Sequence, residues 1–271
     1  MAISKKEYLE KLENAYNQWN GSEDMNRLIK IRGMFTPYSI FNKMLIYSQR
    51  RGAMICAGKN KWEEVGRHLN SGEYSNAIWI YAPIMKTVVR KVKDKNGNEK
   101  EEKTKIVTGF NPVRVYDISQ TNGKDIESIN DKIDGEDAQE IFDLVVDKLS
   151  EKYCITSHTL KESEHTVLID DNTLSIMEEA PCNEKLYSII YKLSKMMAKT
   201  DLNDSDVIAQ ISSSLFMSDL GIDISDTVVK KIALGNIGSD FEKFHSHITA
   251  STILVKKFER EFGLNRQYTN A

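Results

Sequence analysis

Cysteine is scarce in this sequence. The 271 residues include three, Cys56, Cys154 and Cys182, which are far apart and lack the C-x-x-C spacing of thiolate zinc sites. An odd number of isolated cysteines argues against a disulfide framework. We expect them to be small, buried, apolar side chains.

Long apolar runs are also missing. No stretch approaches the roughly 20 apolar residues that span a bilayer, so we expect no membrane partner. The first residues have no apolar segment before a small-residue cleavage site, so they do not resemble a secretory signal. A composition of 40% hydrophobic and 28% charged residues is typical of a soluble globular protein. We therefore expect a cytoplasmic location.

Charge is distributed unevenly along the chain. Residues 1–114 contain 21 Lys and Arg against 12 Asp and Glu, a balance of +9. Residues 115–271 contain 16 against 28, a balance of −12. Such a division suggests that the two halves have different partners, and the basic half suits a polyanion whose counterions are released on binding. A drift of surface charge without functional meaning is the alternative.

The pattern of elements predicts an α+β fold with two domains. Residues 1–125 read as one α+β domain, in which Ser4 and Glu7 form a capping box, a helix covers residues 61–69, and residues 94–105 form a charged connection between strands. Residues 126–271 read as a mainly helical domain with a small β-hairpin. Its helices are expected at residues 136–152, 183–199, 204–220, 225–234 and 239–262.

Several motifs in the first half occur in a fixed order. The first lies on a predicted helix, the next are short glycine and tryptophan motifs, and the densest follows a predicted strand. They are Tyr38-Ser39-xx-Asn42-xx-Leu45-Ile46-xx-Gln49, Gly58, Trp62-xxx-Gly66-Arg67, Gly72-Glu73, Ile80-x-Ala82-Pro83 and Gly109-Phe110-x-Pro112-Val113-x-Val115-x-Asp117-x-Ser119-Gln120-Thr121-x-Gly123.

Together these motifs resemble the N-terminal domain of the ArdC-like antirestriction proteins of plasmids and phages, over roughly residues 5–125. The resemblance implies binding of single-stranded DNA with little sequence preference. Such binding needs cations along the backbone and flat side chains for the bases. The candidate residues are Arg27, Lys30, Arg32, Tyr38, Asn42, Lys43, Gln49, Arg50, Lys59, Trp62, Arg67, Lys86 and Arg90.

Some of these candidates have a plainer interpretation. Trp62 and Trp79 lie in apolar patterns, which are more typical of core residues than of stacking platforms. Arg67 follows a glycine, and a charged residue at a glycine turn usually stays accessible. Asn42 and Gln49 are two helical turns apart, so their amides are expected along one helix face.

In the family that the motifs resemble, a metallopeptidase-like domain usually follows, with His-Glu-x-x-His on its active helix. Applied to residues 183–199, that motif places Tyr191 and Lys195 at the two histidines and Lys192 at the glutamate. The third ligand position is Gln210, counted back from Leu220-Gly221. Because a phenol, an ammonium and an amide suit zinc poorly, we expect a zincin-like domain without catalytic metal or cofactor, and therefore no enzyme.

Three hypotheses follow. The first is a non-sequence-specific single-stranded DNA-binding protein of a mobile element with an antirestriction role. The alternative is an inhibitor that binds a host defence enzyme through the acidic second half. The third is a metallopeptidase with unusual ligands. Against it, His245 and His247 are two apart on a predicted helix and point in different directions, and His158 and His165 have no accompanying acidic motif.

Overall fold

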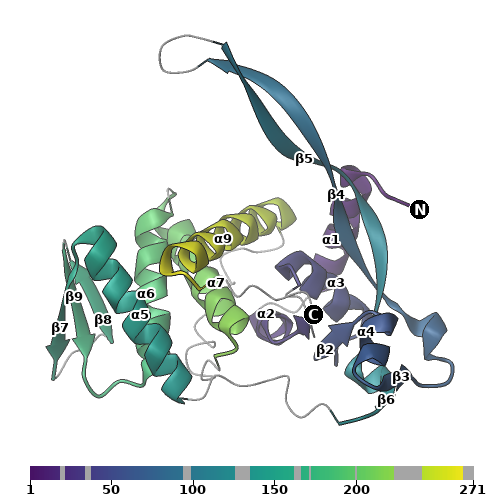
Figure 1. Cartoon of the computed structure of the whole chain (residues 1–271), viewed down its shortest axis with the longest axis horizontal. Coiled ribbons are helices and arrows are strands. Elements are labelled where there is room, and N and C mark those ends of the chain that lie inside the picture. The colour runs from purple at the N-terminus through teal and green to yellow at the C-terminus, as the bar shows by residue number, and fades with distance from the viewer. Residues whose placement is uncertain are drawn as a thin grey trace. The chain divides into compact units, whose positions relative to one another are not determined.

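The computed structural model describes residues 1–18, 22–33, 38–93, 99–125, 135–161, 166–170, 172–198, 200–222 and 240–264. The chain divides into two compact units. Unit 1 comprises residues 1–19 and 31–124, and unit 2 comprises residues 20–30 and 125–271. Residues 20–30 lie within the expected first domain (residues 1–125), but in the structure they belong to unit 2. Both units mix helices and strands (Figure 1), so the predicted α+β class is confirmed.

Unit 1 is built from short helices beside a sheet. Its helical elements are α1 (Lys5–Tyr16), α3 (Ile40–Gln49), α4 (Lys59–Glu64) and the 3-10 turns η1 (Glu73–Asn76) and η2 (Ile118–Gln120). Its strands are β1 (Arg32–Gly33), β2 (Ile55–Ala57), β3 (Arg67–Leu69), β4 (Ile78–Lys93), β5 (Glu99–Asp117) and β6 (Thr121–Gly123). A four-stranded sheet has the order β1-β2-β5-β4, and β3 pairs with β6.

The start of α1 follows the predicted capping box. The Ser4 hydroxyl accepts from the Glu7 backbone N–H, and the Glu7 carboxylate accepts from the Ser4 backbone N–H. These hydrogen bonds lower the pKa of Glu7. The predicted helix over residues 61–69 is wrong at its end, because Gly66 takes a φ of +76° and residues 67–69 continue as β3. Helix α3 begins at Ile40 with Ser39 as its cap.

Strands β4 and β5 form one long antiparallel hairpin that extends beyond the helices of unit 1 (Figure 1). The ladder runs from the pair Ile78–Val115 to the pair Lys93–Glu99, with an irregularity at Ile84/Met85. The expected charged connection over residues 94–105 is therefore too long, because residues 99–105 belong to β5. Pairing with residues 87–93 of β4 continues the strand where composition alone suggested a loop.

Unit 2 consists of packed helices and a small sheet. Its helices are α2 (Ser22–Ile29), α5 (Gly135–Tyr153), α6 (Cys182–Met197), α7 (Leu202–Leu220) and α9 (Phe241–Phe262), and its strands are β7 (Thr156–Leu160), β8 (Val167–Asp170) and β9 (Thr173–Met177). Apolar stripes on α6, α7 and α9 form the core. Gly221 and Gly263 end α7 and α9 in left-handed conformation, as helix C-caps require. The helix expected over residues 225–234 lies outside the described residues.

Helix α2 is an addition that the sequence did not predict. It follows α1 in the chain but belongs to unit 2, where it contacts α7. Met25 and Leu28 of α2 are fully buried, and the Ser218 hydroxyl of α7 donates to the Ile29 carbonyl at 2.8 Å. Within the described ranges, every helix is too short or too polar to cross a membrane.

Candidate functional site

Helix α3 closes the open edge of β4 with two side-chain amides. The Asn42 amide donates to the Tyr81 carbonyl and accepts from the Tyr81 N–H, both at 3.1 Å. Gln49 makes the same pair of bonds with Trp79, both at 2.9 Å. Each amide therefore replaces a missing strand partner at the sheet edge. Asn42 and Gln49 do lie on one helix face, but these bonds use that face for the sheet and not for a ligand.

Asp117, at the end of β5, organises the neighbouring turns. One carboxylate oxygen accepts from the backbone N–H groups of Met54 and Ile55, at 2.8 and 3.2 Å. The other oxygen accepts from the Ser119 N–H and hydroxyl. Asp117 is 1% exposed, so its buried carboxylate depends on these protein donors for its hydrogen bonds. The dense motif around Asp117 thus holds β2, β5 and η2 together.

Arg67 and Trp62 belong to the interior. The Arg67 guanidinium donates to the Thr121 hydroxyl and carbonyl and to the Lys124 carbonyl, at 2.6–3.0 Å. It is 9% exposed, so the expectation that it is accessible is wrong. The Trp62 indole is fully buried and donates to the Tyr116 carbonyl at 2.9 Å. Lys43 is also buried. These three residues hold the fold and present no surface to a nucleic acid.

The remaining predicted residues are spread over several places. Arg27 and Lys30 are exposed and belong to unit 2, whereas Lys86 and Arg90 are exposed on the extended part of β4. On the body of unit 1, Arg50 donates to the Ser119 hydroxyl at 3.0 Å, and Lys59 pairs with Glu63 at 3.1 Å. The Tyr38 hydroxyl donates to the Cys56 carbonyl, and burial raises its pKa. The Arg32 side chain lies outside the described residues.

A cluster of rings and a cation lies where β4, β5 and η1 meet on the surface of unit 1. The Arg114 guanidinium lies 4.9 Å from the ring centroid of Trp79 and 5.4 Å from that of Tyr74. Trp79 is 38% exposed and Tyr74 is 59% exposed. We call Tyr74, Trp79 and Arg114 the ring cluster. It combines two accessible flat side chains with a cation, the chemistry that stacks bases and attracts phosphates.

The backbone beneath the ring cluster is held firmly. Trp79 and Arg114 are partners in the ladder of β4 and β5, so their side chains leave the sheet on the same face. The Gln49 amide fixes the Trp79 backbone from the other edge. The Tyr116 hydroxyl donates to the Tyr74 carbonyl at 3.3 Å and steadies η1. Sequence reasoning favoured a core position over a stacking platform for Trp79 and missed Tyr74 and Arg114, because the face on which a strand residue lies is buried or exposed according to what covers each side of the sheet.

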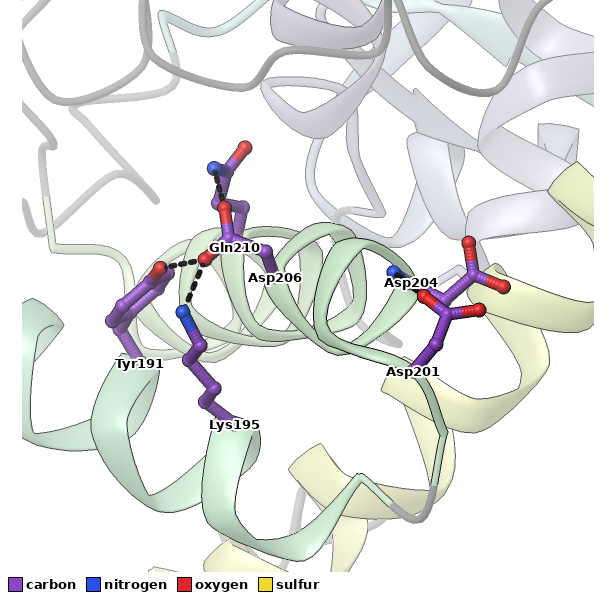
Figure 2. A network of polar contacts seen from close by, with 6 residues as sticks. All are labelled: Tyr191, Lys195, Asp201, Asp204, Asp206 and Gln210. Carbon is purple, nitrogen blue, oxygen red and sulfur yellow. Dashed lines mark hydrogen bonds and ion pairs between the residues drawn. The ribbon is translucent and has the colours of Figure 1, made fainter.

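In unit 2, the three residues assigned to former ligand positions meet around one carboxylate (Figure 2). The Asp206 side chain of α7 accepts hydrogen bonds from the Tyr191 hydroxyl, from the Lys195 ammonium at 2.8 Å and from the Gln210 amide at 2.9 Å. Tyr191 and Lys195 are one turn apart on α6, and Asp206 and Gln210 are one turn apart on α7. Asp206 itself was not predicted. We call these four residues the Asp206 network.

The electrostatics of the Asp206 network favour a carboxylate with proton donors around it. Partial burial opposes ionisation of Asp206, but the hydrogen bonds from Lys195 and Tyr191 outweigh it and lower its pKa. Burial and the bond to Asp206 raise the pKa of Tyr191, so its hydroxyl stays protonated. A divalent metal would find one carboxylate, two neutral groups and a competing ammonium. The residues present therefore do not fit a metallopeptidase zinc.

The described histidines of unit 2 form no cluster either. On α9, His247 is buried with its Nε2 atom 3.4 Å from the Asp204 carboxylate, whereas His245 lies beside the Phe241 ring. His158 is exposed on β7, and His165 lies outside the described residues. Among the described residues, no group of three or more His, Cys, Asp and Glu side chains is arranged to hold a metal ion.

Comparison with known proteins places unit 1 in a family. Residues 5–116 match the model of the N-terminal domain of anti-restriction factor ArdC. An uncharacterized protein of Bacillus anthracis is 32% identical over 135 residues, which cover 43% of this chain and 22% of that protein. The matched part of this chain therefore spans about a fifth of that relative's length.

Two solved structures are similar to this chain. The metal-free crystal structure of the antirestriction ArdC protein from plasmid R388 matches 96% of this chain and 99% of that chain, with a TM-score of 0.50 and 12% identity. Its Mn(II)-bound structure matches 91% of this chain and 98% of that chain, with a TM-score of 0.46 and 12% identity. The family match therefore covers residues 5–116, and the metal-free ArdC structure shares the fold of this chain.

Proposed function

We propose that this protein binds single-stranded DNA of a mobile element without sequence preference, and that the ring cluster is where bases stack. The observation that carries the proposal is the exposed pair of rings that both lie close to the Arg114 guanidinium. Every base has a flat face, so stacking on Trp79 and Tyr74 is tolerant of sequence, while Arg114 attracts the backbone. A protein that coats an entering strand in this way would shield it from host nucleases and so serve antirestriction.

Fluorescence anisotropy with labelled oligonucleotides tests the proposal. Single strands of different sequence should bind alike, more tightly than a blunt duplex, and with affinity that falls steeply with salt. The Trp79→Ala change should weaken binding by about 1–3 kcal/mol, roughly fivefold to 150-fold. Tyr153→Ala is the matched control, since Tyr153 is a 40% exposed ring beside Lys152 in unit 2. Equal loss in both variants would contradict the assignment.

Tryptophan fluorescence offers an independent readout. The chain has three tryptophans, Trp19, Trp62 and Trp79, and all belong to unit 1. Bases stacked on the exposed Trp79 should quench its emission, whereas the buried Trp62 is shielded. Trp79→Phe should keep most of the affinity and lose this component of the quenching. Quenching that is unchanged in Trp79→Phe would place the DNA elsewhere.

For unit 2, we propose a silent metallopeptidase-like domain without catalytic metal. The support is the chemistry of the Asp206 network, in which Tyr191, Lys195 and Gln210 all donate to one carboxylate. Elemental analysis of the purified protein should find zinc and manganese far below stoichiometry, before and after incubation with either ion. Stoichiometric metal that Asp206→Ala removes would instead favour a metallopeptidase with unusual ligands.

A second candidate function is inhibition of a basic host defence protein by the acidic second half. It is favoured by a cleft of about 730 Å³ in unit 2, whose lining includes Asp240, Glu242 and the ion pair of Asp204 with Lys243. Its test is affinity capture with the full-length chain, in which Glu242→Lys should release the captured partner. Capture that is unaffected by Glu242→Lys would argue against this surface.

A further inference from the structure

The outer part of the β4–β5 hairpin is a ribbon whose two faces are both accessible. We define the arm as residues 85–91 of β4 and 101–107 of β5. None of these residues is buried, and the two strands run beyond α1 and α3 (Figure 1). A two-stranded ribbon without packing on either face is only marginally stable. Its exposed surface therefore requires an explanation beyond the fold of unit 1.

One face of the arm is apolar and cationic at the same time. Met85 and Val107 are cross-strand partners, and Val89 faces Lys103 four residues farther along β4. Met85, Val89 and Val107 are 50%, 53% and 41% exposed. Between these pairs lies the pair Thr87–Lys105. Accessible aliphatic side chains so close to lysines would suit a ligand that is both hydrophobic and anionic.

The cations at the base of the arm lack acidic partners across the ladder. Lys86, Lys103 and Lys105 pair in register with Ile106, Val89 and Thr87. Towards the tip, in contrast, Arg90 and Lys91 face Glu102 and Glu101, and Lys91 forms an ion pair with Glu99 at 3.1 Å. The positive charge without an acidic cross-strand partner therefore lies in the part of the arm nearer to the helices of unit 1. Lys86 lies on one face of the ribbon, and Lys103 and Lys105 lie on the other.

The arm contains no aromatic ring, which separates it from the ring cluster. Residues 85–91 and 101–107 consist of aliphatic, threonine and charged side chains. Stacking of unpaired bases needs flat side chains, so the arm is poorly suited to a single strand. The major groove of duplex DNA, about 12 Å wide, admits a two-stranded β-ribbon, lets aliphatic side chains contact thymine methyl groups and brings phosphates to both sides.

We propose that the arm enters the major groove of duplex DNA next to a single strand bound at the ring cluster, so that unit 1 recognises the junction between unpaired and paired DNA. Both surfaces lie on β4, and from Trp79 to Thr87 the strand spans about 26 Å at roughly 3.3 Å per residue. A junction substrate satisfies both surfaces at once, and linked contacts multiply affinity. This inference rests on the proposed binding of single strands by the ring cluster.

The test compares three labelled DNAs with the full-length protein: a single strand, a blunt duplex of about 20 base pairs, roughly two helical turns, and the same duplex with a tail of about 12 nucleotides, within the usual site size. The tailed duplex should bind at least about tenfold more tightly than the single strand or the blunt duplex. Equal affinity for the single strand and the tailed duplex would overturn the inference and leave the proposed function standing. Failure to bind the single strand would overturn both.

Variants separate the two surfaces. Lys103→Gln with Lys105→Gln should abolish the advantage of the tailed duplex, lower its salt slope by about two and leave single-strand affinity unchanged. Lys91→Gln is the matched control, since Glu99 already neutralises that charge, and should change little. Trp79→Ala should weaken the single strand and the tailed duplex alike. If light scattering shows a dimer that the double variant dissociates, the arm binds a second copy and the inference is wrong.

Discussion

The polar side chains of the two units are used differently. In unit 1, Asn42, Gln49 and Asp117 bond to backbone groups of distant strands and turns. In unit 2, the Asp206 network joins side chains to one another, and Asp206 and Lys195 are 35% and 38% exposed. A side chain that replaces a missing backbone partner leaves buried groups unpaired when it is removed. A half-exposed ion pair is largely replaceable by water. Motif residues of unit 1 are therefore expected to determine the fold, and those of unit 2 to be replaceable.

The largest effect is expected at Asp117. Asp117→Ala removes the acceptor for Met54, Ile55 and Ser119, and should lower the free energy of unfolding of unit 1 by about 3 kcal/mol or more. Urea unfolding followed by tryptophan fluorescence measures it, because every tryptophan is in unit 1. Glu10→Ala, on the exposed side of α1, should cost almost nothing. A loss below 1 kcal/mol at Asp117 would contradict the difference between the units.

The second largest loss of stability is expected at Arg67. Arg67→Ala removes three hydrogen bonds and buried packing and should lower the stability of unit 1 by about 2–4 kcal/mol. Arg67→Lys should recover part of this loss, because the ammonium reaches fewer acceptors. DNA affinity measured on the folded fraction should stay close to wild type. A folded Arg67→Lys protein that no longer binds single strands would show that Arg67 belongs to the DNA-binding surface after all.

The two amides at the edge of β4, Asn42 and Gln49, can be compared with each other. Asn42→Ala and Gln49→Ala should each lower stability by about 1–2 kcal/mol, since each leaves one N–H and one C=O of β4 without a protein partner. Gln49→Ala should also weaken single-strand binding, because it loosens the backbone of Trp79. Asn42→Ala should not. Identical effects on binding would mean that the amides act through general stability alone.

The smallest effect is expected in the Asp206 network. Asp206→Asn should lower the stability of unit 2 by about 1 kcal/mol or less, because the pair is screened by water. The pKa of Asp206 is lowered in the folded state, so its contribution is present above the ordinary Asp pKa and is lost as the pH falls through the folded value. Far-UV circular dichroism of the helices should show a smaller fall in stability from pH 5 to about pH 2 in Asp206→Asn. A larger fall would refute the network's stabilising role.

Local signals in the sequence predicted much of this fold. The capping box at Ser4, the glycines after α7 and α9, and the apolar stripes of unit 2 act within one turn of a helix, so a short window of sequence contains the cause. Helix α2 is not predicted, because Asn20-Gly21 is a turn signal that separates residues 22–29 from the first helix in the sequence. Its buried face is set by α7, almost two hundred residues later in the chain.

The candidate site was harder to predict, because burial is decided by distant partners. Arg67 beside Gly66 looks like a surface residue until Thr121 and Lys124 supply acceptors. Trp62 and Trp79 lie in similar apolar contexts, yet one is fully buried and the other is accessible. Asp204 and Asp206 lie on the same helix, so helix position alone does not distinguish them. The spacing of four residues between Asp206 and Gln210 is the sequence signal that favours Asp206 as the partner of Gln210.

Helix α2 has a consequence for genetic dissection of this protein. The chain leaves unit 1 after residue 19, contributes α2 to unit 2, returns at residue 31 and leaves again after residue 124. A fragment that stops at residue 125 would carry α2 without the surface that covers Met25 and Leu28, and would expose an aggregation-prone stripe. Cleavage of the peptide chain between residues 125 and 135 would not separate the two units, because residues 20–30 of unit 2 would remain on the N-terminal fragment. To express the two units separately, the segment that contains α2 should be removed from the unit 1 fragment and joined to the unit 2 fragment.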